Sequence, residues 1–123
     1  MIVCYTRERG YKGSGVDRSL TLGKKYIVFG IDFRPNSLEY PTKLGLISDS
    51  DGTPCLFELN FFDVVNEEIP PDWVFTHLGD GYYRLCPKEF TGDFWDRFHD
   101  ADTLAEEEFQ EVRKKLEKFY GKK

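Results

Sequence analysis

Asp49 and Asp51 are the residues of this chain whose types and spacing come closest to a catalytic pattern. They lie in the sequence Ser-Asp-Ser-Asp-Gly-Thr at 48–53, between two apolar runs. Two carboxylates two positions apart raise the question of Mg²⁺-dependent phosphoryl chemistry. However, Asp-Gly between hydrophobic runs indicates a tight β-hairpin, because Gly52 can adopt the positive φ that such a turn requires. We therefore predict a hairpin within 43–65, in which both aspartates bond to local backbone.

Residues 46–53 resemble the DxDGT signature of haloacid-dehalogenase-type phosphatases, including its hydrophobic lead-in. The resemblance implies that Asp49 is a nucleophile, that Asp51 is a general acid/base and that Mg²⁺ shields the phosphoryl charge. That family folds around a parallel α/β sheet. The chain after Thr53 shows strand, turn and strand and then helix, without β-α-β alternation. The turn is therefore the prediction, and Mg-dependent phosphatase-like activity is the alternative.

No catalytic residue, metal site or cofactor is predicted elsewhere. An EF-hand loop counted from Asp49 lacks both the glycine and the glutamate that it needs. His77 and His99 are isolated, which is typical of a packing histidine and of a histidine at a helix end. The glycine-rich basic segment 7–19 does not match the GxxxxGK[ST] phosphate loop, and no helical pattern follows it. We predict that this segment is a mobile loop.

Short strands separated by turn residues are expected around the central hairpin. Runs of β-branched and aromatic residues predict further strands at 2–5, 26–33, 59–65 and 82–86. The run at 26–33 is almost continuously apolar, which predicts burial on both of its faces for part of its length. The double proline at 70–71 breaks the pattern because proline lacks an N–H donor. The residues that follow, 73–75, read equally well as a turn or a strand.

The last third of the chain predicts two helices. Phenylalanines recur every four residues within 90–98, and Gly92 breaks the start of this pattern. Asp102 or Thr103 is suited to cap the final helix. The apolar positions of that helix recur at spacings of three, four and three: Phe109, Val112, Leu116 and Phe119. This stripe is predicted to pack on the β-rich part, and a homodimer seam through the C-terminal helix is the alternative.

Three motifs in order along residues 20–65 are similar to small SH3-like barrel proteins of bacteria and phage. They are the strand LTLGKKYIV at 20–28, the turn ISDSDG at 47–52 and the strand FDVV at 62–65. The resemblance implies a small SH3-like antiparallel β-barrel or rolled sheet. Some such proteins act as immunity or antitoxin-like partners of toxins, and the resemblance supplies no catalytic residue.

The chain has the length of one domain, and its composition is sufficient for a core. It has 123 residues, of which 40% are hydrophobic and 16% aromatic, which argues against general disorder. We predict an α+β fold in a single domain over 1–123. Within it, 1–88 forms the β-rich barrel, and 89–123 is a helical C-terminal extension packed on that barrel and containing two α-helices.

The net charge indicates which kinds of partner to expect, and the cysteine content indicates the cellular compartment. The net charge of −5 disfavours nucleic acid, because phosphate contacts require a basic face. The three cysteines are odd in number and form no CxxC pair, which predicts free thiols in a reducing cytoplasm. No apolar run has the length of a membrane span. We therefore predict a cytoplasmic protein that binds neither nucleic acid nor membrane.

Four residues around the double proline form the predicted partner-binding surface: Glu67, Glu68, Asp72 and Trp73. Aromatic anchors dominate the energetics of protein interfaces, and acidic residues there favour a basic partner. Packing of Trp73 into the core is the alternative. The predicted function is noncatalytic protein binding, in its sharpest form a bacterial immunity-type inhibitor that covers a basic toxin surface. A structural domain that self-associates is a further alternative.

Overall fold

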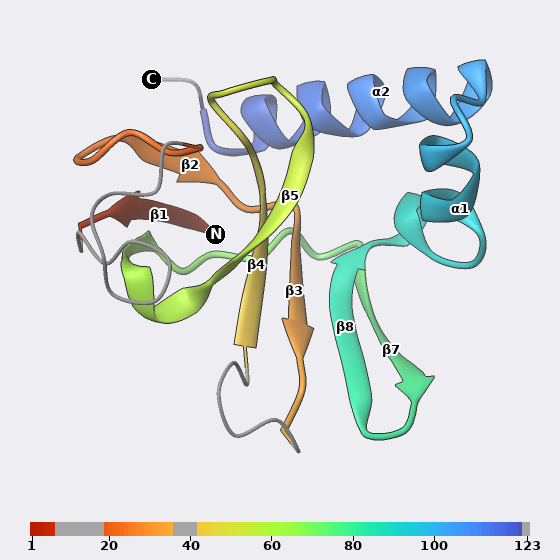
Figure 1. Ribbon diagram of the computed structural model, residues 1–123, viewed down its shortest axis with the longest axis horizontal. Coiled ribbons are helices and arrows are strands. Elements are labelled where there is room, and N and C mark those ends of the chain that lie inside the picture. The colour runs from red at the N-terminus through yellow and green to blue at the C-terminus, as the bar shows by residue number, and fades with distance from the viewer. Residues whose placement is uncertain (7–18, 36–41, 122–123) are drawn as a thin grey trace.

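The computed structural model describes residues 1–6, 19–35 and 42–121. Its strands are β1 (Ile2–Tyr5), β2 (Lys25–Ile27), β3 (Gly30–Phe33), β4 (Thr42–Ile47), β5 (Pro54–Glu58), β6 (Phe62–Asn66), β7 (Trp73–Gly79) and β8 (Tyr82–Pro87). Two helices follow, α1 (Phe94–His99) and α2 (Thr103–Phe119), and short 3₁₀ helices span Leu59–Phe61 and Lys88–Phe90. The predicted α+β fold, with the β-rich part first and two helices at its end, is confirmed (Figure 1).

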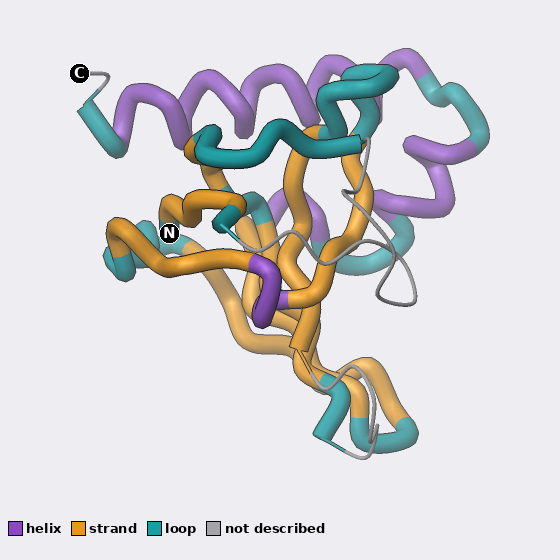
Figure 2. Tube along the Cα trace, turned by 60° about the vertical axis from the view of Figure 1, so that its left-hand side comes forward, coloured by secondary structure: helices purple, strands orange, loops and turns teal. Residues whose placement is uncertain are grey.

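The strands form two antiparallel sheets. One has three strands in the order β2-β1-β6, and the other has five in the order β5-β4-β3-β8-β7. Within the described residues no ladder joins the two sheets into a closed barrel. Helix α2 lies across one end of the strands, with α1 folded back beneath it (Figures 1 and 2). In the larger sheet, β5 and β7 are the edge strands, because each of them pairs with only one of the described strands.

The apolar run at 26–33, predicted as one strand, is divided between the two sheets. Its first part, β2, pairs with β1, whereas its second part, β3, pairs with β4 and β8. Phe29 lies between the two parts, and its amide donates to the Gly45 carbonyl at 3.0 Å. A Cβ at Gly45 would lie 2.7 Å from the Phe29 ring, so only glycine leaves room for that ring. The predicted burial of this run on both faces is therefore explained by the chain crossing from one sheet to the other between β2 and β3.

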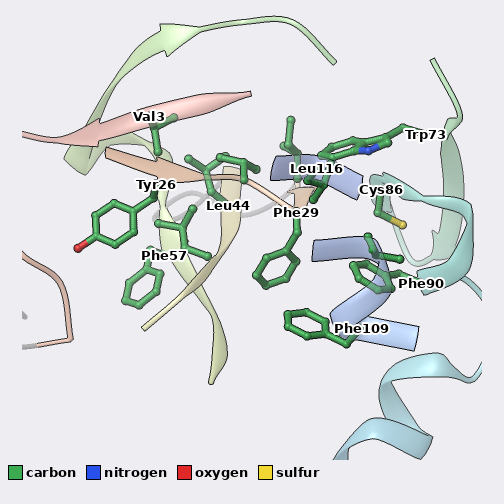
Figure 3. Packing of buried hydrophobic residues seen from close by; sticks show 14 of the residues in the cluster. Val3, Tyr26, Phe29, Leu44, Phe57, Trp73, Cys86, Phe90, Phe109 and Leu116 are labelled. Atoms are coloured by element: carbon green, nitrogen blue, oxygen red, sulfur yellow. The ribbon is translucent and has the colours of Figure 1, made fainter. Parts of the chain in front are cut away.

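Buried side chains of both sheets and both helices belong to one core cluster. Helix α2 contributes the residues of its apolar stripe, Ala105, Phe109, Val112 and Leu116. Phe29 and Phe109 meet edge to face at 5.6 Å between ring centroids, which ties the helix to the larger sheet (Figure 3). Phe119, predicted to extend the stripe, is 37% exposed. Phe109, Val112 and Leu116 are therefore buried inside the chain, as expected for a stripe that packs on the β-rich part.

The helical region agrees with the sequence pattern in its caps and its break. Asp102 caps α2 by accepting a hydrogen bond from the Leu104 amide at 3.2 Å. The predicted helix at 90–98 is a 3₁₀ turn followed by α1, and Gly92, with φ of 68°, separates the two. The residues after the double proline form β7, so the strand interpretation of 73–75 is the correct one.

Two further expectations concern the glycine-rich segment at 7–19 and helices that could span a membrane. The predicted mobile loop at 7–19 lies almost wholly outside the described residues, which resume at Ser19. In the described ranges, no helix combines the length and the apolarity needed to cross a membrane.

One acidic side chain is buried within the larger sheet. The Asp32 carboxylate, 6% exposed, accepts from Arg84 Nε at 2.7 Å and from Arg84 Nη2 at 3.1 Å. Arg34 Nη2 lies 3.6 Å from the same carboxylate. These two cations offset the cost of burying the Asp32 charge, and the Asp32 hydrogen bond in turn raises the pKa of Arg84.

Candidate partner-binding surface

The central hairpin forms as predicted. Strands β4 and β5 pair in register from Lys43 with Glu58 to Ile47 with Pro54. The turn closes with the Ser48 amide donating to the Thr53 carbonyl at 2.8 Å. Gly52 has φ of 72°, the left-handed conformation expected for this position.

Asp49 does not behave as a local turn residue, which corrects the prediction. Its carboxylate accepts hydrogen bonds from three groups, two on the segment that leads into β2 and one within β2: Thr21 Oγ1 at 2.7 Å, Lys24 Nζ at 2.6 Å and the Tyr26 hydroxyl at 2.5 Å. Desolvation alone would raise the pKa of Asp49, but these bonds outweigh it and lower the pKa to about 2. Asp49 therefore ties the turn to the smaller sheet.

Asp51 behaves as predicted. Its Oδ1 accepts from the Thr53 amide at 3.1 Å and from the Thr53 hydroxyl at 2.8 Å, both within the turn. These two bonds lower the pKa of Asp51. Both aspartates of the DxDGT sequence are thus occupied by structural hydrogen bonds.

This arrangement gives no support to phosphoryl chemistry. The Asp49 carboxylate would have to give up its bonds to Lys24 and Tyr26 before it could act as a nucleophile. The sheets around it are antiparallel, whereas the phosphatase family requires parallel strands. In the described part of the chain, no three His, Cys, Asp or Glu side chains gather closely enough to hold a metal ion.

The acidic loop, residues 67–72, joins β6 of the smaller sheet to β7 of the larger one. Glu67 and Glu68 are exposed, and among the described residues neither carboxylate forms a salt bridge. The Met1 ammonium donates to the Glu68 carbonyl at 2.8 Å and is attracted by the charge of Glu68. The backbone beneath them is held in place: the Asn66 side chain accepts from the Glu68 amide at 2.9 Å, and the Glu68 carbonyl accepts from the Tyr120 hydroxyl at 2.9 Å. Two exposed carboxylates therefore lie on a fixed segment of backbone, and the Met1 ammonium offsets part of the charge of Glu68.

Tyr120 remains a donor over a wide pH range. Burial, together with the nearby negative charge of Glu68, raises the pKa of Tyr120 to about 12. The hydroxyl consequently stays protonated at neutral pH, and its bond to the loop carbonyl persists. The end of α2 thus anchors the acidic loop.

Trp73 lies in the core and is only 8% exposed, so it is not a surface anchor (Figure 3). This corrects the predicted surface in favour of the alternative in which Trp73 packs inside. Asp72 Oδ2 lies 3.5 Å from Lys115 Nζ, and the same Nζ donates to Glu89 Oε2 at 2.7 Å. Lys115 thereby offsets part of the charge that Asp72 would present to a partner.

A groove of about 280 Å³ separates the end of the acidic loop from the C-terminal half of α2. Asp72 and Lys115 line it together with apolar residues: Pro70, Pro71, Pro87, Trp73, Val112 and Phe119. The structure thus brings Asp72 and Trp73 together at one groove. Glu67 and Glu68 precede it in the loop and do not line it.

Glu89, Lys115, Lys118 and Phe119 also line this groove, together with Leu116, and the sequence did not indicate their place there. Lys115 lies in the C-terminal half of α2, where a lysine complements the helix dipole without any specific partner. Its two acidic partners lie 26 and 43 positions away in the chain, so no local pattern could indicate them. Phe119 was assigned to the core, although it is partly exposed beside the loop.

The remaining candidates for chemistry have structural roles. Burial raises the pKa of the Cys86 thiol to about 11, which leaves it protonated and unreactive at neutral pH. His77 stacks on Tyr83 with ring centroids 4.8 Å apart. His99 shares the rim of a hollow of about 200 Å³ with Cys86, and no hydrogen bond joins the two. The exposed thiol of Cys55 also lines this hollow.

Comparisons of the chain with protein-family models, with curated proteins and with solved structures found no match.

Proposed function

We propose that this protein is a noncatalytic protein-binding module whose acidic loop and adjoining groove receive a basic partner, in the manner of an immunity-type inhibitor of a bacterial toxin. One observation carries the proposal: Glu67 and Glu68 are exposed and form no salt bridge within the described residues, on a fixed loop that runs into a partly apolar groove. Exposed acids beside apolar surface are suited to cationic side chains, whose stems are apolar and whose ends are charged.

The geometry assigns different contributions to the loop and the groove. The two glutamates attract a basic partner and orient it, and the net charge of −5 raises the rate of encounter at low salt. The proline-rich wall and Phe119 supply apolar area that a lysine or arginine stem can cover. Because the Glu68 carbonyl is already bonded to Tyr120, little backbone order has to be gained on binding.

The test begins with affinity capture from a lysate of the native cell, washed at low and high salt, followed by purification of any stoichiometric basic protein. Binding is then measured by calorimetry for the double variant Glu67→Lys/Glu68→Lys. Loss of two attractive charges and gain of two repulsive ones should weaken affinity by about 100-fold or more.

The matched control is Glu106→Lys/Glu107→Lys, which makes the same change of charge at two exposed positions of α2. An equal loss in both double variants would show that the overall field, rather than the acidic loop, attracts the partner. Unchanged affinity in the loop variant, or the absence of any basic partner, would overturn the proposal.

A further inference from the structure

Strand β7 presents an open, uncharged edge. Within the described residues it pairs only with β8, and its sequence Trp-Val-Phe-Thr-His-Leu-Gly holds no Asp, Glu, Lys, Arg or Pro. Phe75 is 63% exposed, Leu78 46% and Val74 37%. Exposed edges of this kind usually carry a charge or a proline that prevents pairing with another strand.

The other edge strands carry such residues. Lys25 lies in β2 and Asp63 in β6, while β5 begins at Pro54 and ends at Glu58. Among the described edge strands, β7 alone lacks this protection. The contrast singles out β7 as the edge open to a further strand.

The register of the sheet shows which backbone groups of β7 point outward. Trp73 is opposite Pro87, which has no N–H, so these two residues cannot exchange both hydrogen bonds. The Trp73 amide donates instead to the Pro70 carbonyl at 3.3 Å. Because antiparallel pairs alternate, Val74 and Thr76 bond to β8, and the amides and carbonyls of Phe75 and His77 face away from it.

We propose that a second copy of this chain docks on this edge, with the two β7 strands antiparallel and Thr76 on the two-fold axis. This register places Phe75 of each copy opposite His77 of the other. Each of these two pairs can exchange two N–H···O bonds, so all the outward-facing groups of Phe75 and His77 are satisfied. The two five-stranded sheets then form one continuous sheet.

The side chains of β7 suit this self-pairing. Phe75 and His77 both stack on Tyr83 in their own chain, with ring centroids 5.5 and 4.8 Å apart. Facing Phe75 with His77 of the second copy extends this aromatic layer across the axis. On the opposite face Thr76 meets its symmetry mate, and β-branched or hydroxyl pairs of this kind are favourable across strands.

Charge at the ends of the strand limits the strength of the pairing. The same register brings Asp72 of one copy toward Asp80 of the other, and both copies carry a net charge of −5. A register shift between His77 and Gly79 also bends the end of β7. Salt that screens these acids should strengthen the dimer, whereas it should weaken binding of a basic partner at the acidic loop. The two proposals can therefore fail independently.

The first experiment is sedimentation equilibrium of the full chain over a concentration series at about 0.05 M and about 0.5 M salt. A monomer–dimer equilibrium that is tighter at the higher salt is expected. Thr76→Glu should weaken it by about tenfold or more, because like charges then meet on the axis. In the monomer the new carboxylate faces Arg84, so the fold is retained, which circular dichroism can verify.

Gln110→Glu, an equal change of charge on the exposed face of α2, is the matched control and should leave the equilibrium unchanged. A monomer at all concentrations and both salts would overturn the proposal. A dimer that resists Thr76→Glu would also overturn it, because the interface would then lie elsewhere.

The register is tested by cross-linking in a Cys55→Ser background, which removes the exposed native thiol. Opposed Cα atoms of a non-hydrogen-bonded pair lie about 4.5 Å apart, so Thr76→Cys should form a disulfide-linked dimer under mild oxidation. Leu78→Cys is the control, because its symmetry mate would lie about 13 Å away along the strands. Equal cross-linking through both positions would contradict the Thr76-centred register.

Discussion

The turn at 48–53 and the acidic loop at 67–72 are both rich in acidic residues, yet the fold uses their charges in opposite ways. The Asp49 carboxylate accepts three hydrogen bonds from β2 and the segment leading into it. The carboxylates of Glu67 and Glu68 accept no such hydrogen bond within the described residues, although the backbone of their loop is bonded and Asp72 at its end lies 3.5 Å from Lys115. A carboxylate whose bonding capacity is met inside the chain stabilises the fold, whereas an exposed, unpaired one is available to a partner.

Asp32 is a buried carboxylate whose charge is met inside the chain, and its substitution should have the largest effect on stability. Asp32→Ala leaves Arg84 beside a vacated, largely buried position and should lower the free energy of unfolding by about 3–5 kcal/mol. Urea denaturation measures the change. Asp32→Asn keeps an acceptor for Arg84 and should therefore lower the free energy of unfolding by less than Asp32→Ala does. A loss well below about 3 kcal/mol in the alanine variant would contradict the ion-pair account.

Asp49 should rank second. Asp49→Ala removes the acceptor for Thr21, Lys24 and Tyr26 together and should cost about 2 kcal/mol. Tyr26→Phe removes one donor to Asp49 and the acceptor of the Thr21 amide, and should cost about 1 kcal/mol. If Asp49→Ala were as stable as the wild type, Asp49 would be free for another role, and the contrast between the two segments would collapse.

The pH dependence of stability separates Asp49 from other acids. Its folded pKa of about 2 lies below its ordinary value of 3.8, so the unfolded chain binds more protons between these values. The Asp49 contribution is complete above pH 3.8 and is lost as the pH falls toward 2. Asp49→Asn should remove this part of the slope in denaturation series, and an unchanged slope would count against the tie to β2.

Glu67→Gln/Glu68→Gln should have the smallest effect on stability, within about 0.5 kcal/mol, because neither side chain is paired in the described fold. The same double variant should lower affinity for a basic partner. A large loss of stability would show that these charges already serve the fold, and would place the acidic loop with the turn rather than in contrast to it.

Local signals in the sequence were sufficient for much of the fold. The hairpin follows from Asp51-Gly52 between apolar runs, and α2 begins where Asp102 can cap it. The apolar stripe of α2 follows from its helical spacing, and the exposure of Glu67 and Glu68 follows from their place beside two prolines. Each depends on residues within a few positions of one another, whose preferences act before any tertiary contact forms.

Long-range packing decided the rest. The run at 26–33 has no alternation of polar and apolar residues that would distinguish one strand from two. In the fold, Phe29 packs over Gly45 at the point between β2 and β3. From the sequence, Trp73 could have been an exposed anchor or a core residue. It is buried in the fold, where it lies next to Leu116 of α2 (Figure 3). The bonds of Asp49 and the bridge of Lys115 to Asp72 join residues 23 to 43 positions apart, so their charges are assigned only when the sheets and α2 come together.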